Sequence, residues 1–255
     1  MTGQLARLGV STAVLLSLSG MGARADEADA KRTMKAMSNY VASQSAISFK
    51  FDTNLEIVSK DHQKVLLASS GTIDLNRPDK IRATRKGGFA NVEVVFDGTT
   101  LTVFDRLANA YAQAQVPGSI DHLIDELREK YHRPVPGADL LSSDIYGNLM
   151  PQVTDVKDLG SGVIGGTECD HFAFRTQDVD WQIWIAQGDK PYPCRYIITA
   201  KQVDQAPQYS VQISDWKTGS DANFQFTDTT NARKIDTQDL GDTDELPNRF
   251  RGGSQ

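Results

Sequence analysis

The chain of 255 residues has only two cysteines, Cys169 and Cys194, and only four histidines. The histidines lie far apart, and none has the spacing of a metal-binding motif such as H-E-x-x-H. Two cysteines without a nearby pair of histidines make a poor zinc site. No serine stands in a G-x-S-x-G elbow, and no pair of carboxylates can be singled out. The sequence therefore predicts no metal, no cofactor and no catalytic residue, and it argues against a hydrolase or another enzyme.

Long hydrophobic runs are also scarce, and the one apolar segment of note lies at the N-terminus. Arg7 precedes a short apolar stretch from Leu8 to Leu18, and Ala23-Arg24-Ala25 follows with small residues at the positions that signal peptidase reads. The stretch is too short to span a bilayer. We predict a signal peptide over residues 1–25, cut after Ala25, in preference to a buried N-terminal helix. No cysteine lies near the cut, so a lipid anchor there is excluded, and we expect an exported, soluble protein in the periplasm.

Basic side chains are the minority. Without residues 1–25 the chain keeps 25 Lys and Arg against 33 Asp and Glu, a net charge of −8. Binding to nucleic acid needs clustered Lys and Arg against the phosphates, so we expect no nucleic-acid partner. The one local basic cluster consists of Arg77, Lys80, Arg82, Arg85 and Lys86. It has two interpretations: a solvated edge strand that resists aggregation, or a contact for an acidic partner or a lipid headgroup.

Hydrophobic periodicity divides the rest of the chain into strands and a few helices. Helical spacing predicts a helix over residues 29–40, then a period of two sets in, as where Ile47, Phe49 and Phe51 alternate with polar residues. Strands are expected near residues 47–57, 65–75, 80–86, 92–96, 101–103 and 111–116, and after residue 153 near 168–175, 181–187, 194–201, 208–216 and around Phe224. This order predicts an α+β domain over residues 26–235, with one large curved antiparallel sheet and helices on one side. The polar segment 236–255 is expected to be a disordered tail.

Two helices are expected between the two runs of strands. Ser119 is a candidate N-cap, and Ile120, Leu123, Ile124, Leu127 and Tyr131 form an apolar stripe, with Glu126 and Lys130 paired on the wet side. A shorter helix is expected over residues 138–146. The amphipathic helix is either a lid over a cavity or a cover of the core, and periodicity does not distinguish these.

The two cysteines of an exported chain favour a Cys169–Cys194 disulfide over two separate buried thiols. Hairpin register places Cys169 opposite about Gln187 and Cys194 opposite about Ala186, on the two neighbours of one strand. Next-nearest strands are about 9.5 Å apart, too far for a bridge. The bond therefore requires that the middle strand end first, or that a bulge intervene, and Gly188 with the segment 191–193 makes an early end plausible.

Several motifs resemble a known family. The segment Leu75-Asn76-Arg77-Pro78-Asp79-Lys80-Ile81-Arg82, followed by Phe96-Asp97-Gly98-Thr99-Thr100-Leu101, resembles LolA, the periplasmic lipoprotein carrier. A more specific resemblance is to a family of predicted periplasmic proteins of unknown function in the LolA/LolB-like superfamily. It rests on the segments Ala138-Asp139-Leu140-Leu141, Cys169-Asp170-His171-Phe172-Ala173-Phe174-Arg175, Asp180-Trp181-Gln182-Ile183-Trp184-Ile185, Pro191-Tyr192-Pro193-Cys194, Pro207-Gln208-Tyr209 and Asp215-Trp216.

The resemblance implies a half-open β-barrel whose helices cover or plug a hydrophobic cavity for acyl chains. It also implies that Arg77, like the matching arginine of LolA, hydrogen-bonds to the helical lid and keeps it shut. Docking to a transporter or to an outer-membrane receptor does not carry over, since fold does not fix function.

The first functional hypothesis is a non-catalytic periplasmic carrier or binding module for a lipid or another acyl-bearing ligand. Its expected cavity residues lie on apolar strand faces in the carrier-like half of the sheet: Phe49, Phe51, Leu55, Ile57, Val94 and Phe96. The alternative is a sensor or protein-interaction module on the same fold, without a transported ligand, in which a sheet edge or the basic strand binds a membrane or periplasmic protein partner. A monomer is expected.

Overall fold

The computed structural model of the chain describes residues 21–131 and 135–238. The first helix, α1 (Met21–Ser43), already includes residues 21–25 of the expected signal peptide, and residues 1–20 lie outside the described part. The expected cut after Ala25 therefore stays a prediction. Most of the expected tail, residues 239–255, also lies outside the described part.

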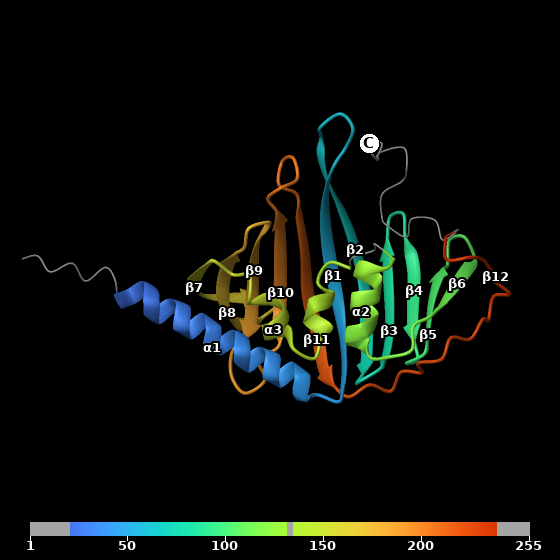
Figure 1. Cartoon of the computed structure of the whole chain (residues 1–255), viewed down its shortest axis with the longest axis horizontal. Coiled ribbons are helices and arrows are strands. Elements are labelled where there is room, and N and C mark those ends of the chain that lie inside the picture. Colours follow the sequence, from blue (N-terminus) through green and yellow to red (C-terminus); the bar gives the residue numbers. More distant parts are fainter. Residues whose placement is uncertain (1–20, 132–134, 239–255) are drawn as a thin grey trace, which may run out of the picture.

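One twelve-stranded sheet organises the described chain (Figure 1), in the order β12-β6-β5-β4-β3-β2-β1-β11-β10-β9-β8-β7. The strands of the first half are β1 (Ala46–Val58), β2 (Lys64–Asn76), β3 (Lys80–Gly87), β4 (Asn91–Phe96), β5 (Thr100–Asp105) and β6 (Ala110–Gln115). Those of the second half are β7 (Asp155–Ile164), β8 (Thr167–Arg175), β9 (Val179–Ala186), β10 (Pro193–Ala200), β11 (Gln208–Thr218) and β12 (Arg233–Lys234). The pairs are antiparallel except for β12 with β6, and β1 joins the halves by pairing with both β2 and β11.

The expected fold class is confirmed: the sheet is open, and its helices lie on one face (Figure 1). The helices after β6 are α2 (Ile120–Glu129), the short 3₁₀ helix η1 (Ala138–Leu141) and α3 (Ile145–Leu149). Residues 138–146 therefore form two short helical turns instead of the single helix expected, because Ser142 at the end of η1 is extended and Asp144 caps a new helix.

The larger core lies between α1 and the second half of the sheet. Met34, Met37 and Val41 of α1 are buried, as their helical spacing predicted. They form one cluster with inward-facing strand residues such as Phe172 and Ile183. Alternation with a period of two explains why these strand residues share one face.

A second core lies under α2. Ser119 caps the helix and accepts a hydrogen bond from the backbone N–H of His122 at 3.2 Å, as predicted. Leu123 packs with Phe96 and Ile81 of the sheet. The predicted pair on the wet side, Glu126 and Lys130, also forms, at 2.8 Å.

The C-terminal segment differs from the expectation. The prediction of a strand around Phe224 is wrong, because residues 219–232 cross the outer face of the first half of the sheet without forming a strand. Phe226 packs against Phe104 and Tyr111 there, with ring centroids 5.7 and 5.0 Å apart. The segment ends as β12, which pairs in parallel with β6 and so covers that edge of the sheet.

The basic strand is not an edge. β3 lies between β2 and β4, so the interpretation of its lysines and arginines as a solvated edge is wrong. Arg82 points to the outer face, where it pairs with the buried carboxylate of Glu93 and donates to the carbonyl of Asn223 at 2.6 Å. Arg106 pairs with the same carboxylate. Two arginines thus compensate the cost of burying Glu93, and one of them holds the C-terminal segment.

The cysteines lie together where the register analysis requires. β9 ends at Ala186, which is opposite Cys169, and the register of β10 shifts between Pro193 and Arg195, so that Cys194 lies in a bulge. Both thiols are buried, and burial raises the pKa of each. Their Sγ atoms are 2.7 Å apart, whereas a disulfide bond is about 2.05 Å long. The structure therefore has two free thiols, and the expected bond stays a prediction.

We expect the exported protein to form this bond, because an early strand end or a bulge would allow it and both are present. Alkylation under denaturing, non-reducing conditions should then label no thiol, and a reductant should lower the melting temperature. The loop of about 25 residues corresponds to roughly 3 kcal/mol in the chain-entropy model. The variant Cys169→Ala/Cys194→Ala serves as the control, since a reductant should not affect it. Two labelled thiols in the protein from the periplasm would disprove the bond.

Candidate functional site

An apolar cavity of about 480 Å³ lies between the helices after β6 and the sheet. Ile124 and Leu127 of α2 line one side, and Leu55, Ile198 and Tyr209 line the other. The remaining contributors are Glu56, Arg128, Val135, Pro136, Gly137, Ala138, Asp139, Val179, Ala200, Pro207 and Gln208. The cavity thus lies where α2 and η1 face β1, β10 and β11.

The apolar side chains around this cavity are not packed as a core is. Leu55, Ile124, Leu127 and Ile198 are half-buried, and Val135 is 55% exposed. Apolar surface that a protein leaves accessible in a concave site is available to a ligand. The volume falls in the range of about 300–1,000 Å³ that small-molecule sites have.

The three charged residues of the cavity lining are paired. Arg128 of α2 donates to Asp139 of η1 at 2.9 Å, which joins two elements of the cover. Glu56 pairs with Lys64 across β1 and β2 at 3.2 Å. Because most of the remaining lining is apolar, a ligand in this cavity would meet mainly apolar side chains.

Of the six cavity residues expected from the sequence, Leu55 lines this cavity and the other five line neither described cavity. Phe96 is fully buried in the core under α2, and Val94 packs against it. Phe49 and Phe51 belong to the core under α1, and Phe49 stacks on Trp216. Ile57 is half-buried.

Sequence analysis missed the cavity residues of the second half of the sheet. Ile198 and Tyr209 lie in strands that were expected. The expected cavity residues, however, all came from the first half of the sheet, where the carrier-like motifs lie. The sequence did indicate one wall of the cavity, because Ile124 and Leu127 belong to the predicted apolar stripe of α2. The sequence does not reveal that β11 pairs with β1. This pairing brings β10 and β11 opposite that stripe.

Arg77 lies at the turn between β2 and β3 and reaches the helical cover. Its guanidinium donates to the backbone carbonyl of Ser142, just after η1, at 3.2 Å. Burial lowers the pKa of the Arg77 guanidinium, and the nearby carboxylate of Asp121 opposes this shift. An arginine stays charged at neutral pH even so.

Two further hydrogen bonds connect the same three segments. The backbone N–H of Ile120, at the start of α2, donates to the carbonyl of Pro78 at 2.9 Å. The carboxylate of Asp121 accepts from the backbone N–H of Ser143 at 2.8 Å. The turn after β2, the start of α2 and the segment after η1 thus form one network around Arg77.

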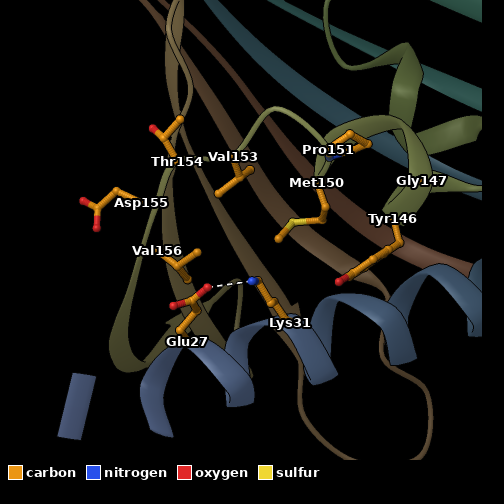
Figure 2. Close-up of a pocket in the computed structure, with 10 residues that line it drawn as sticks. All are labelled: Glu27, Lys31, Tyr146, Gly147, Met150, Pro151, Val153, Thr154, Asp155 and Val156. Carbon is orange, nitrogen blue, oxygen red and sulfur yellow. Dashed lines mark hydrogen bonds and ion pairs between the residues drawn. The ribbon is translucent and has the colours of Figure 1, made fainter. Parts of the chain in front are cut away.

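A second cavity, of about 420 Å³, lies between the start of α1, α3 and β7. Figure 2 shows Lys31 with its ammonium bonded to Glu27, and Met150 and Val156 line the same cavity. The other residues are Tyr146, Gly147, Pro151, Val153, Thr154 and Asp155. Its cation is already paired with Glu27 at 2.6 Å, and Asp155 pairs with Lys157. We therefore favour the apolar cavity as the candidate site.

Within residues 21–131 and 135–238, no group of three or more His, Cys, Asp or Glu side chains is arranged to hold a metal ion. None of the helices in this part of the chain combines the length and the apolarity needed to cross a membrane.

A family of predicted periplasmic proteins, DUF2092, matches residues 30–238, which is nearly the whole described chain. The chain belongs to this family. The protein is accordingly periplasmic, as expected. No curated protein matches the sequence.

Solved structures with similar folds include the Mycobacterium tuberculosis lipoprotein LppX, with 15% identity, a TM-score of 0.47, and coverage of 78% of this chain and 100% of that one. MucB of the Pseudomonas aeruginosa MucA/MucB complex has 12% identity and a TM-score of 0.43, with coverage of 75% and 58%. A LolA superfamily protein from Nitrosomonas europaea has 10% identity and a TM-score of 0.36, with coverage of 75% and 94%. All three TM-scores are below 0.5, so these structures carry no argument about the function of this protein.

We predict that Arg77 holds the helical cover against the sheet. Arg77→Leu removes a charged donor worth about 1.5–3 kcal/mol and leaves the buried carbonyl of Ser142 without its partner. Amide hydrogen exchange in residues 120–131 and 135–146 should become faster, while exchange in β8 and β9 stays unchanged. Lys86→Leu is the matched control, because it removes a positive charge from an exposed position on the next strand. Equal exchange in both variants would contradict the role of Arg77.

Proposed function

We propose that this protein is a periplasmic binding or carrier module for a lipid or another ligand with an acyl chain. It shields the chain from water and makes or breaks no covalent bond. The supporting observation is the apolar cavity under α2, whose lining is accessible although it is apolar.

The physical basis is the transfer of methylene groups out of water. Each buried CH₂ contributes about 0.8 kcal/mol, so a chain of several methylenes gains enough to offset the cost of ordering it. Leu127 on one side and Ile198 on the other would contact such a chain. A headgroup would remain at the mouth, near Arg128 and Glu56.

Entry of the chain requires the cover to move. α2 and η1 carry one wall of the cavity, and two hydrogen bonds tie this cover to the turn after β2: Arg77 with Ser142, and the backbone N–H of Ile120 with the carbonyl of Pro78. Breaking two hydrogen bonds costs much less than unfolding the core. We therefore propose that the cover opens at these contacts while the core under α1 stays intact.

The alternative, a protein-interaction module, is favoured by one observation. β7 pairs only with β8 among the described strands, so its other edge is open. Leu159 and Val163 on this strand are 47% and 66% exposed. An open edge with exposed apolar residues is a template for another strand.

The carrier proposal predicts that the folded protein binds a fluorescent fatty-acid probe at about one equivalent. Leu55→Asp places a carboxylate in the cavity and should weaken probe binding strongly, since an ionised group there would have no partner in a dry complex. Its melting temperature should change little, because Leu55 is half-buried and the apo cavity is accessible to water.

Two variants make this experiment decisive. Phe96→Glu buries a charge in a packed core and should lower the melting temperature sharply. Leu107→Asp changes a 64% exposed residue far from the cavity and should alter neither property. If the folded wild type binds no probe, the carrier proposal fails and the interaction module becomes the better explanation.

A further inference from the structure

The open edge of β7 has a short regular segment. β7 is the last strand of the sheet (Figure 1), and among the described strands it pairs only with β8. The backbone N–H and C=O groups that face away from β8 therefore have no strand partner in the described chain. The regular segment begins at Thr154, whose N–H donates to the carbonyl of Arg175 at 2.8 Å. It ends at Asp158, because the register with β8 shifts directly afterwards. Val156 is thus the middle of this edge.

The two sides of this edge differ in chemistry. Val156 is directly opposite Phe174, a buried residue of the core under α1, so it projects from the inner face of the sheet. Asp155 and Lys157 alternate with it and project from the outer face, where their side chains pair with each other. Both charged side chains are about half exposed. The edge therefore has an apolar residue on one side, between two opposite charges on the other.

The second cavity, of about 420 Å³, borders this edge on the inner side. Val156 lines it together with Met150 and Val153, and Figure 2 shows these side chains around the same space. Lys31 of α1 lies on this cavity too, but it already pairs with Glu27. An apolar side chain carried by a strand beside β7 would therefore find apolar contacts next to Val156.

One self-pairing of β7 matches its charges. When two copies of a strand pair antiparallel around a two-fold axis, with both inner faces on one side, one residue lies opposite itself and its neighbours face one another in reverse order. If Val156 lies opposite Val156, then Asp155 lies opposite Lys157 of the second copy, twice. A shift of the centre by one residue would put Asp155 opposite Asp155 or Lys157 opposite Lys157. Like charges directly opposite each other are destabilising.

We propose that the exported protein forms a two-fold dimer through β7, in which residues 154–158 of two copies pair as antiparallel strands. The pairing satisfies open backbone groups, brings the two Val156 side chains together where the two cavities meet, and forms two Asp155–Lys157 pairs between the copies. The contact is small, and interfaces below about 1,200 Å² belong to weak complexes. The monomer expected from the sequence is then the species at low concentration.

The dimer does not depend on the carrier function, because the apolar cavity lies elsewhere, where α2 and η1 face β1, β10 and β11. Sedimentation velocity tests the dimer on the full exported protein. The sedimentation coefficient should rise between about 5 and about 500 µM protein, as a weak association requires. Probe binding is measured separately, so failure of the dimer and failure of the carrier proposal are distinguishable.

Two charge variants test the pairing. Asp155→Lys gives the edge two positive charges, and Lys157→Asp gives it two negative charges. Each variant alone should dimerise at least about tenfold more weakly than the wild type, since like charges then lie opposite each other. An equimolar mixture should restore the dimer, because each charge of one variant then meets its opposite in the other. Asp189→Lys and Lys190→Asp are the matched controls: they make the same changes at exposed positions of the turn after β9 and should have no effect.

Cysteine cross-linking tests the register. The two copies of Val156 lie opposite each other, with Cα atoms about 4.5–5.5 Å apart, which a disulfide can span. Val156→Cys should therefore give a covalent dimer under mild oxidation. Thr154→Cys is the control, because Thr154 is more exposed but lies opposite Asp158 of the second copy, about 13 Å from the other Thr154. It should cross-link at least about tenfold more slowly.

Four results would overturn the proposal. A wild type that stays monomeric at the highest concentration would leave the edge to a strand of another protein. Charge variants that dimerise as tightly as the wild type would place the contact elsewhere. Variants that melt at the wild-type temperature and stay monomeric when mixed would remove the charge pairing. Equal cross-linking of the two cysteine variants would remove the register, and this comparison decides if a charge variant does not fold.

Discussion

The main constraint on this structure is that a few helices must cover one apolar face of a twelve-stranded sheet. A sheet needs a partner for its apolar face, and the described chain supplies only α1, α2, η1 and α3. α1 covers the second half of the sheet and α2 covers the first, each with its own core. The apolar cavity lies where the two covered regions meet, since Ile198 and Tyr209 of its lining pack at the edge of the core under α1 and Leu127 packs at the edge of the core under α2. It is thus a consequence of architecture, and this is why its lining is apolar and yet accessible.

Most of the fold was predictable, because the sheet is regular. Alternation with a period of two predicted ten of the strands to within about two residues at their ends, as for β1 and β8. The strand end at Ala186 and the bulge at Cys194 followed from requiring two cysteines on next-nearest strands to meet. The C-terminal segment was not predictable. Its attachment depends on long-range contacts, such as Arg82 with Asn223 and Phe226 with Tyr111, and these leave no periodic signal.

The candidate site was predictable only in part. The resemblance to a carrier family directed attention to the first half of the sheet, and there the large side chains, Phe96 above all, turn out to fill a core. Alternation shows which face a residue is on but not whether the opposite element touches it. Leu55 and Phe49 lie on the same face of the same strand, and only the position of the cover makes one a cavity residue and the other a core residue.

The same alternation gives the sheet two chemically distinct faces, and β10 belongs to both. Ile198 of β10 points inward to the apolar cavity, whereas Arg195, three residues earlier, points outward over the indole of Trp184. β11 behaves likewise, with Tyr209 inward and Gln212 outward. An apolar group suits the inner face because helices exclude water there, and a charged group suits the outer face because part of it stays exposed to solvent. Since the two faces share the backbone of β10 and β11, a displacement of these strands moves the side chains of both faces.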